Sequence, residues 1–105
     1  MYRGTTPTIV FKINTDIDLS EVDVCYITFK VNHNDPDNIK EFDTQDIVID
    51  AEEKTLTIVL DQEDTLFFPV GLANVQIRLR TNDGLAYASN IKTVPIDRIL
   101  KGGVI

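Results

Sequence analysis

The sequence predicts an all-β protein, an immunoglobulin-like β-sandwich of about seven strands with one short helical crossover turn. Apolar and polar residues alternate with period 2 along most of the chain, and turn-forming residues separate the alternating runs. The length of 105 residues fits one domain that spans residues 1–105. The chain has one Cys and no Trp, so it lacks the markers of antibody domains, and a small barrel is the alternative fold.

Two strands are expected in the first third of the chain. The first runs from about Thr8 to Asn14 and the second from about Val22 to Val31, each with every second residue apolar. Cys25 falls on the apolar face of the second strand. We interpret Cys25 as a small core side chain, because no cationic neighbour in the sequence would stabilise a thiolate.

A polar loop and a hairpin are expected in the middle of the chain. Asn, Asp and Pro concentrate between residues 33 and 38, which predicts a loop, and a short strand is expected at Ile39 to Phe42. Alternating runs then lie on either side of the charged segment 52–54. Two such runs joined by a short connection predict an antiparallel hairpin.

At Asp61 the period changes, and a short helical turn is expected. The Asp61 side chain can cap the free N–H groups of a first turn, and Asp64, three residues later, completes a pattern that resembles a capping box. The apolar run Leu-Phe-Phe at 66–68 is expected to close the edge of the core from this turn. Pro69 is expected to end the turn, because proline lacks a backbone N–H.

The last third of the chain predicts a second hairpin and an edge strand. Alternation from residue 75 to residue 80 predicts a strand, and Asp83-Gly84 predicts a tight turn because both residues tolerate positive φ. Residues 85–91 are expected to form the return strand, and the apolar segment 93–100 a last edge strand or turn. Val104 and Ile105 are expected to be either frayed or docked on a neighbouring subunit.

Acidic residues outnumber basic ones, 17 to 10, which gives a net charge of −7. A net negative charge is unsuited to binding the phosphates of a nucleic acid, so nucleic acid is excluded as a partner. Between Asp35 and Asp64 there are 11 acidic and two basic residues, a local charge of −9 that leaves +2 elsewhere. Two interpretations are open: the acidic residues occupy turns and maintain solubility, or the chain is charge-polarised and meets a partner or a copy of itself head to tail.

Neither a signal peptide nor a membrane segment is expected. No stretch of the sequence approaches the ~20 apolar residues that cross a bilayer. Cys25 is the only cysteine, which excludes an intramolecular disulfide. Synthesis and folding in a reducing cytoplasm, without contact with a membrane, fit this pattern best.

The sequence offers little material for catalysis or for holding a metal. His33 is the only histidine and lies in the polar loop, without the serine motif of a nucleophilic triad. One Cys and one His are too few to enclose zinc, and the pairs Asp16/Asp18 and Asp35/Asp37 lack the rest of a calcium loop. We therefore expect no enzymatic activity, no cofactor and no metal.

One set of basic and polar side chains stands out against the acidic background. Alternation places them on the polar faces of three expected strands: Lys12, Lys30, Gln76, Arg78 and Arg80. An ordinary solvated sheet face is the simplest interpretation of this set. The alternative is a basic interface that receives the 35–64 acidic region of a neighbouring molecule.

Several short segments of the chain resemble a family of phage proteins. They are Arg3 to Thr8, Phe11 to Ile13, Tyr26 to Lys30, Leu60 to Phe67, Val75 to Arg78, Asp83-Gly84, Ala88-Ser89 and Val94 to Leu100. In these segments and in its length the chain resembles small structural proteins of tailed phages and prophages of Gram-positive bacteria. It is similar, more distantly, to the N-terminal immunoglobulin-like domain of phage baseplate upper proteins.

The resemblance implies a non-enzymatic tail or baseplate component that assembles through protein–protein contacts. Its partners would be other virion or tail proteins, or further copies of itself in a homo-oligomer. It would be made in the cytoplasm of a host bacterium and then enter the virion. The resemblance transfers no catalytic residue.

A carbohydrate-binding or cell-surface-binding sandwich is the alternative function, since β-sandwiches often carry such sites. Sugar sites usually contain aromatic platforms. This chain has no Trp, and only Tyr2, Tyr26 and Tyr87 are candidates for an exposed platform.

Overall fold

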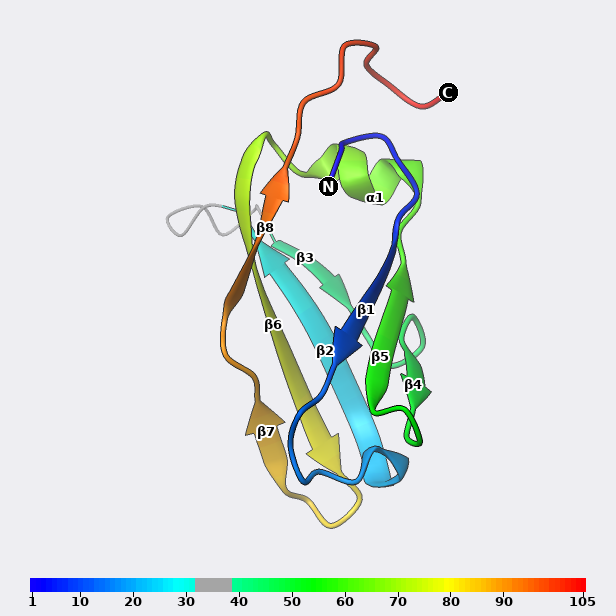
Figure 1. Cartoon of the computed structure of the whole chain (residues 1–105), viewed down its shortest axis with the longest axis vertical. Helices are drawn as coiled ribbons and strands as arrows, with labels where there is room; N and C mark the ends of the chain where they lie inside the picture. The colour runs from blue at the N-terminus through cyan, green and yellow to red at the C-terminus, as the bar shows by residue number, and fades with distance from the viewer. Residues whose placement is uncertain (32–38) are drawn as a thin grey trace.

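The computed structural model describes residues 1–31 and 39–105, which form two antiparallel sheets packed face to face (Figure 1). The expected loop at 33–38, which contains His33, lies outside the described residues. The molecule is elongated along the strands, with extents of 46 × 29 × 21 Å. The predicted all-β sandwich is confirmed.

The smaller sheet has three strands in the order β1-β5-β4, and the larger has five, in the order β3-β2-β6-β7 with β8 also on β6. The smaller sheet consists of β1 (Thr8–Lys12), β5 (Thr55–Val59) and β4 (Val48–Asp50). The larger sheet consists of β2 (Val22–Lys30), β3 (Ile39–Phe42), β6 (Gly71–Thr81), β7 (Ala86–Ala88) and β8 (Lys92–Ile96). Two short helices, η1 (Leu19–Glu21) and α1 (Gln62–Phe67), join strands.

This strand order is that of an immunoglobulin fold without its first strand. The smaller sheet corresponds to strands B-E-D and the larger sheet to strands C′-C-F-G. The last strand is divided into β7 and β8, which explains why eight strands stand where the sequence predicts about seven. The described residues before β1 form an isolated bridge between Tyr2 and Asp97 but no strand A, so β1 lies at the edge of its sheet.

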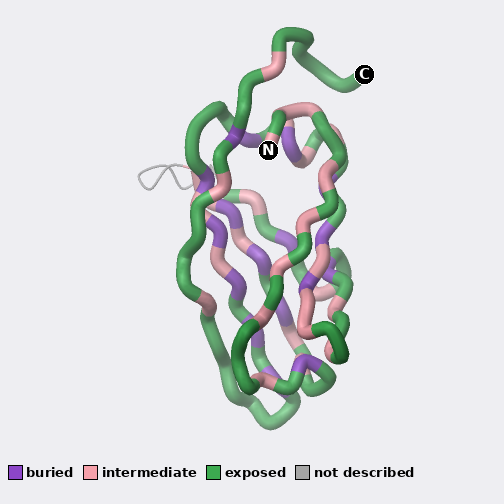
Figure 2. The backbone as a smooth tube through the Cα atoms, viewed as in Figure 1, coloured by how far each residue is buried: buried purple, intermediate pink, exposed green. Residues whose placement is uncertain are grey.

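The core lies between the two sheets and follows the predicted alternation (Figure 2). Cys25, Ile27 and Phe29 of β2 face inward and are fully buried, while the residues between them face outward. The Phe29 ring contacts the rings of Phe42 and Phe68, with centroids 6.0 and 5.4 Å away. Cys25 is thus the core side chain that the sequence predicts.

Helix α1 begins and ends as its residue types predict. The Asp61 side chain accepts from the Asp64 N–H at 2.7 Å, and the Asp64 side chain accepts from the Asp61 N–H at 3.0 Å, so the capping box is complete. The expectation that the whole 66–68 run closes the core is wrong for Phe67, which is 38% exposed, whereas Phe68 is fully buried. Consecutive residues at the end of a helical turn point in different directions, so one phenylalanine enters the core and its neighbour does not.

The return strand expected at 85–91 is also shorter and more exposed than the alternation suggests. The strand that pairs residue by residue with β6 is only Ala86–Ala88, and Leu85, Tyr87 and Ile91 are all exposed. The three-stranded sheet is narrower than the sheet that contains β7, so this edge has no facing layer to bury its apolar side chains. Alternation therefore identified a strand here but not its burial.

The turn before β2 contains an element that the sequence analysis missed. The Asp18 side chain caps η1 by accepting from the Ser20 N–H at 3.0 Å, and Leu19 is buried behind it. The Ser20 hydroxyl and N–H hold the pKa of Asp18 below its ordinary value. An aspartate followed by an apolar residue and a serine is a typical helix start, and it was the available signal.

The last residues of the chain lie above α1 (Figure 1). The backbone of Ile105 exchanges two hydrogen bonds with the Gln62 side chain, at 2.8 and 3.0 Å. The side chains of Val104 and Ile105 remain exposed. The backbone is thus docked on its own helix, and docking of these side chains on another subunit stays a prediction.

Candidate functional site

The outward face of the larger sheet brings together most of the predicted basic set. In the register of β2 with β6, Tyr26 lies opposite Arg78, Thr28 opposite Gln76, and Lys30 opposite Asn74. These residues alternate with the buried ones, so their side chains point away from the core. Tyr26 is 40% exposed and Arg78 is exposed, which places an aromatic ring and a guanidinium side by side near the middle of this face.

Two contacts fix the surroundings of this Tyr26–Arg78 pair. The register of β2 shifts at Asp23, and this irregularity lets the Asp23 carboxylate accept from Arg80 Nη2 at 2.7 Å. Gln76 Nε2 donates to the Ser89 carbonyl at 2.9 Å. Arg80 and Gln76 are therefore engaged within the chain. Among residues 1–31 and 39–105, Arg78 and Lys30 have no acidic partner.

Ser89 also explains why the last strand divides where it does. Its N–H donates to the Ile77 carbonyl at 2.8 Å, and its hydroxyl accepts from the Ile77 N–H at 2.9 Å. A side chain thus replaces one backbone partner of β6 between β7 and β8. The edge of the sheet remains bonded there while the chain changes course.

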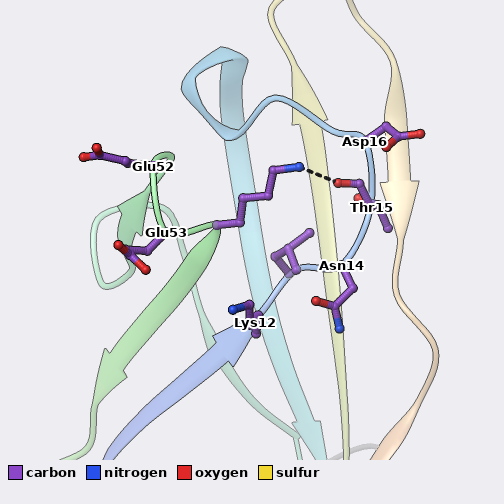
Figure 3. A pocket seen from close by; sticks show the side chains of 8 residues that line it. Lys12, Asn14, Thr15, Asp16, Glu52 and Glu53 are labelled. Atoms are coloured by element: carbon purple, nitrogen blue, oxygen red, sulfur yellow. Dashed lines mark hydrogen bonds between the residues drawn. The ribbon is translucent and has the colours of Figure 1, made fainter.

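Lys12 is not part of this face, because β1 belongs to the smaller sheet. It lies beside an open hollow lined by the segments 12–16 and 52–54 (Figure 3). Lys54, with a φ of 56°, turns the chain there, and its Nζ donates to the Thr15 carbonyl at 2.9 Å. Figure 3 shows the carboxylates of Glu52 and Glu53 pointing away from that of Asp16, so the charged groups around the hollow do not converge on one point.

A second hollow, between β3 and the β4-β5 edge, holds an ion pair. Lys40 Nζ lies 2.8 Å from Asp64 Oδ1, and it stacks over the Phe67 ring at 5.9 Å. Partial burial alone would raise the pKa of Asp64, but the hydrogen bonds from Lys40 and from the Asp61 N–H hold it below its ordinary value. The Asp64 carboxylate is thus bonded to the start of α1 and to Lys40 of β3, and it is not free to bind a ligand.

The acidic residues of the described part of the 35–64 segment are used largely in turns. Asp50 accepts from the N–H groups of Glu52 and Glu53, and Asp43 accepts from that of Gln45. Asp61 and Asp64 cap α1. These contacts favour the interpretation that the acidic residues occupy turns, and the head-to-tail interpretation stays a prediction.

The described residues contain no group of three or more His, Cys, Asp or Glu side chains placed to hold a metal ion. His33 and the pair Asp35/Asp37 lie in the part of the chain that is not described. Burial raises the pKa of the Cys25 thiol to about 11, which keeps it protonated near neutral pH. The three tyrosines are exposed but stand apart: Tyr2 near the N-terminus, Tyr26 on the outward face of β2, and Tyr87 on β7.

Two features of the surface were not recognised from the sequence. The first is Tyr26, which was named as a candidate sugar platform and not with the basic set, although the cross-strand register makes it the neighbour of Arg78. The second is the outward face of the smaller sheet, which was given no role and where Val10, Val48 and Val59 are 58%, 66% and 66% exposed. Each of these valines alternates with inward-facing apolar neighbours, and that alternation was the available signal.

Comparisons with known proteins identify no relative. No protein-family model, curated protein or solved structure matches the chain. In the described residues, neither helix has the length and apolar character needed to cross a membrane.

Proposed function

We propose that this chain is a non-enzymatic structural module of a tailed-phage or prophage virion, which acts through protein–protein contacts in the tail or baseplate. The observation that carries the contact role is the exposed cross-strand pair of Tyr26 and Arg78 on the larger sheet. Tyrosine and arginine are enriched among the residues that dominate binding energy at protein interfaces. The virion assignment itself rests on the sequence resemblance.

Three features of this face suit a protein partner. The Arg80–Asp23 ion pair and the Gln76–Ser89 hydrogen bond hold the surrounding polar groups in place, which lowers the entropy lost on binding. Arg78 and Lys30 remain without acidic partners among the described residues, so a partner with acidic groups would complement them. Tyr26 offers an apolar ring with a polar tip, which is favourable at the centre of such a contact.

Purified tailed particles from the bacterium that encodes the chain test this proposal. Mass spectrometry of the particles should detect the chain in a fixed ratio to the tail proteins. Particles that contain the tail proteins but lack the chain would overturn the virion assignment.

A charge reversal tests the contact face. Arg78→Glu should reduce incorporation into particles, or binding to purified tail proteins, by about tenfold or more, a loss of about 1.4 kcal/mol. Lys92→Glu makes the same kind of change at an exposed residue of β8 and serves as the matched control. Equal effects of the two substitutions would show that total charge matters and the face does not.

A further inference from the structure

The free edge of β1 presents unpaired backbone groups in a regular row. The Leu60 N–H donates to the Pro7 carbonyl and the Ile13 N–H to the Lys54 carbonyl, so the odd-numbered residues of this strand are bonded toward β5. The even-numbered residues Thr8, Val10 and Lys12 therefore direct their N–H and C=O groups away from β5. Within the described parts of the chain, no hydrogen bond reaches these groups.

The core-facing side chains of β1 also lack a neighbouring strand on the free side. Ile9 and Phe11 lie opposite Ile58 and Leu56 of β5 and face the same core. Ile58 and Leu56 are 1% and 0% exposed, whereas Ile9 and Phe11 are only partly buried. One more strand beside β1 would cover the remaining apolar surface of both residues.

The other sheet edges carry features that discourage strand addition. Edge strand β3 contains Lys40, which lies opposite the buried Phe29, and edge strand β8 contains Pro95. Strands β4 and β7 have only three residues each. Inward-facing charges, prolines and short strands are the usual protection of an edge. Strand β1 has five residues, with no proline and no inward charge.

The sequence of β1 is suited to pairing with a second copy of itself, because an antiparallel register centred on Val10 sets Val10 opposite Val10 and Ile9 opposite Phe11. Two molecules of net charge −7 repel each other over most of their surfaces. The first 15 residues, however, contain Arg3 and Lys12 and no acidic residue. The strand itself therefore adds no acidic group to this repulsion, and the carboxylates of Asp16, Glu52 and Glu53 lie only around the hollow at its Lys12 end.

We propose that two copies of this chain pair antiparallel through their β1 edges, about a two-fold axis that passes midway between the two Val10 residues. In this register Val10 lies opposite Val10 of the second copy, and Thr8 lies opposite Lys12 at both ends. All of these are positions whose backbone groups are free, so each pair exchanges both of its hydrogen bonds. The two lysines stay apart, and Ile9 lies opposite Phe11 of the second copy on the core side.

The pairing also extends the outward face of the smaller sheet. Val10, Thr57 and Val48 form one row across β1, β5 and β4. The two-fold axis joins this row to its copy and makes one continuous sheet from the two smaller sheets. The proposal deepens the proposed function by naming a second copy as a partner, and it rests on that function only for the biological use of the dimer.

Sedimentation of the full chain from about 10 μM to about 1 mM, the range of weak small interfaces, tests the pairing. The wild type should show a concentration-dependent dimer, and Val10→Lys should raise its dissociation constant about tenfold or more, because two lysines then meet across the axis. Val48→Lys is the matched control, since Val48 is also exposed on the smaller sheet, and it should leave the dimer intact. Circular dichroism confirms that both variants are folded.

A charge-swap experiment tests the register. Val10→Glu alone should weaken the dimer in the same way, and an equal mixture of Val10→Lys and Val10→Glu should recover a heterodimer. A chain that remains monomeric at about 1 mM, a Val10→Lys variant that dimerises like the wild type, or a mixture without recovery would overturn the proposal.

The outcomes separate this proposal from the virion assignment. A dimer sensitive to Val10→Lys, in a chain that is absent from purified particles, refutes the proposed function and supports the pairing. A monomeric chain that is found in purified particles supports the proposed function and refutes the pairing. Arg78→Glu, on the other sheet, should leave the dimer unchanged.

Discussion

Adjacent phenylalanines at the end of α1 should differ several-fold in their effect on stability. Phe68 is fully buried, with its ring centroid 5.4 Å from that of Phe29, whereas Phe67 is 38% exposed. Phe68→Ala should lower the free energy of unfolding by about 3–5 kcal/mol, because it removes apolar surface and leaves a cavity. Phe67→Ala loses an edge contact with Phe68 and the stacked Lys40, which together are worth about 1 kcal/mol.

Denaturant unfolding followed by circular dichroism measures both losses. A domain of this size has a stability of about 5–15 kcal/mol, so Phe68→Ala removes a large part of it and should lower Tm by more than about 12 °C. If Phe68→Ala does not fold, Phe68→Leu preserves the comparison with a smaller cavity. Equal losses at the two positions, or a larger loss at Phe67, would refute the assignment of Phe68 alone to the core.

Three further predictions concern pH, the thiol and one glycine. The pKa of Asp64 is lower in the folded protein than its ordinary value of 3.8, so its charge stabilises the fold fully above pH 3.8. This stabilisation is lost as the pH falls through the folded pKa. The difference in free energy of unfolding between wild type and Asp64→Asn, measured by urea titration, should therefore shrink below pH 3.8. Cys25, with its pKa raised to about 11, should react with a thiol reagent at about pH 8 only after unfolding, and rapid labelling of the native protein would contradict its burial. Gly4 has a φ of +72°, and an added Cβ would lie 3.0 Å from Ile99 Cδ1. Gly4→Ala should therefore cost about 1 kcal/mol or more in thermal unfolding, and more than Gly84→Ala, where φ is also positive but the space is open.

Local patterns were sufficient to predict most strands because the two sheets bury one face each. Period 2 over Val22–Lys30 and Gly71–Thr81 identifies both the strand and its inner side when another layer covers it. The capping box at Asp61 is likewise a local feature, complete within one turn. Phe67 was less predictable because its direction depends on where the helical turn ends, and the β7 strand because its burial depends on how far the opposite sheet extends.

The candidate site was only partly predictable because register is not a local property. Alternation placed Lys30, Arg78 and Lys12 on polar faces, but it did not show which sheet each strand joins. Long-range pairing separates Lys12 from the others and sets Tyr26 beside Arg78. The shift at Asp23, where β2 has one extra residue opposite β6, is also a property of the pairing, and it brings Asp23 to Arg80.

The two proposed surfaces are compatible because they lie on different sheets of the sandwich. A two-fold axis through the β1 edges is perpendicular to the joined smaller sheets, so it keeps both larger sheets on the same side of the dimer. The two Tyr26–Arg78 faces would then point in the same direction, opposite to the outward faces of the smaller sheets, where Val10, Val48 and Val59 are exposed. A partner that repeats along an assembly could bind both faces at once, and the second contact would strengthen the first without any new residue. Val10→Lys should therefore weaken binding to a repeated partner while leaving binding to an isolated copy of that partner unchanged.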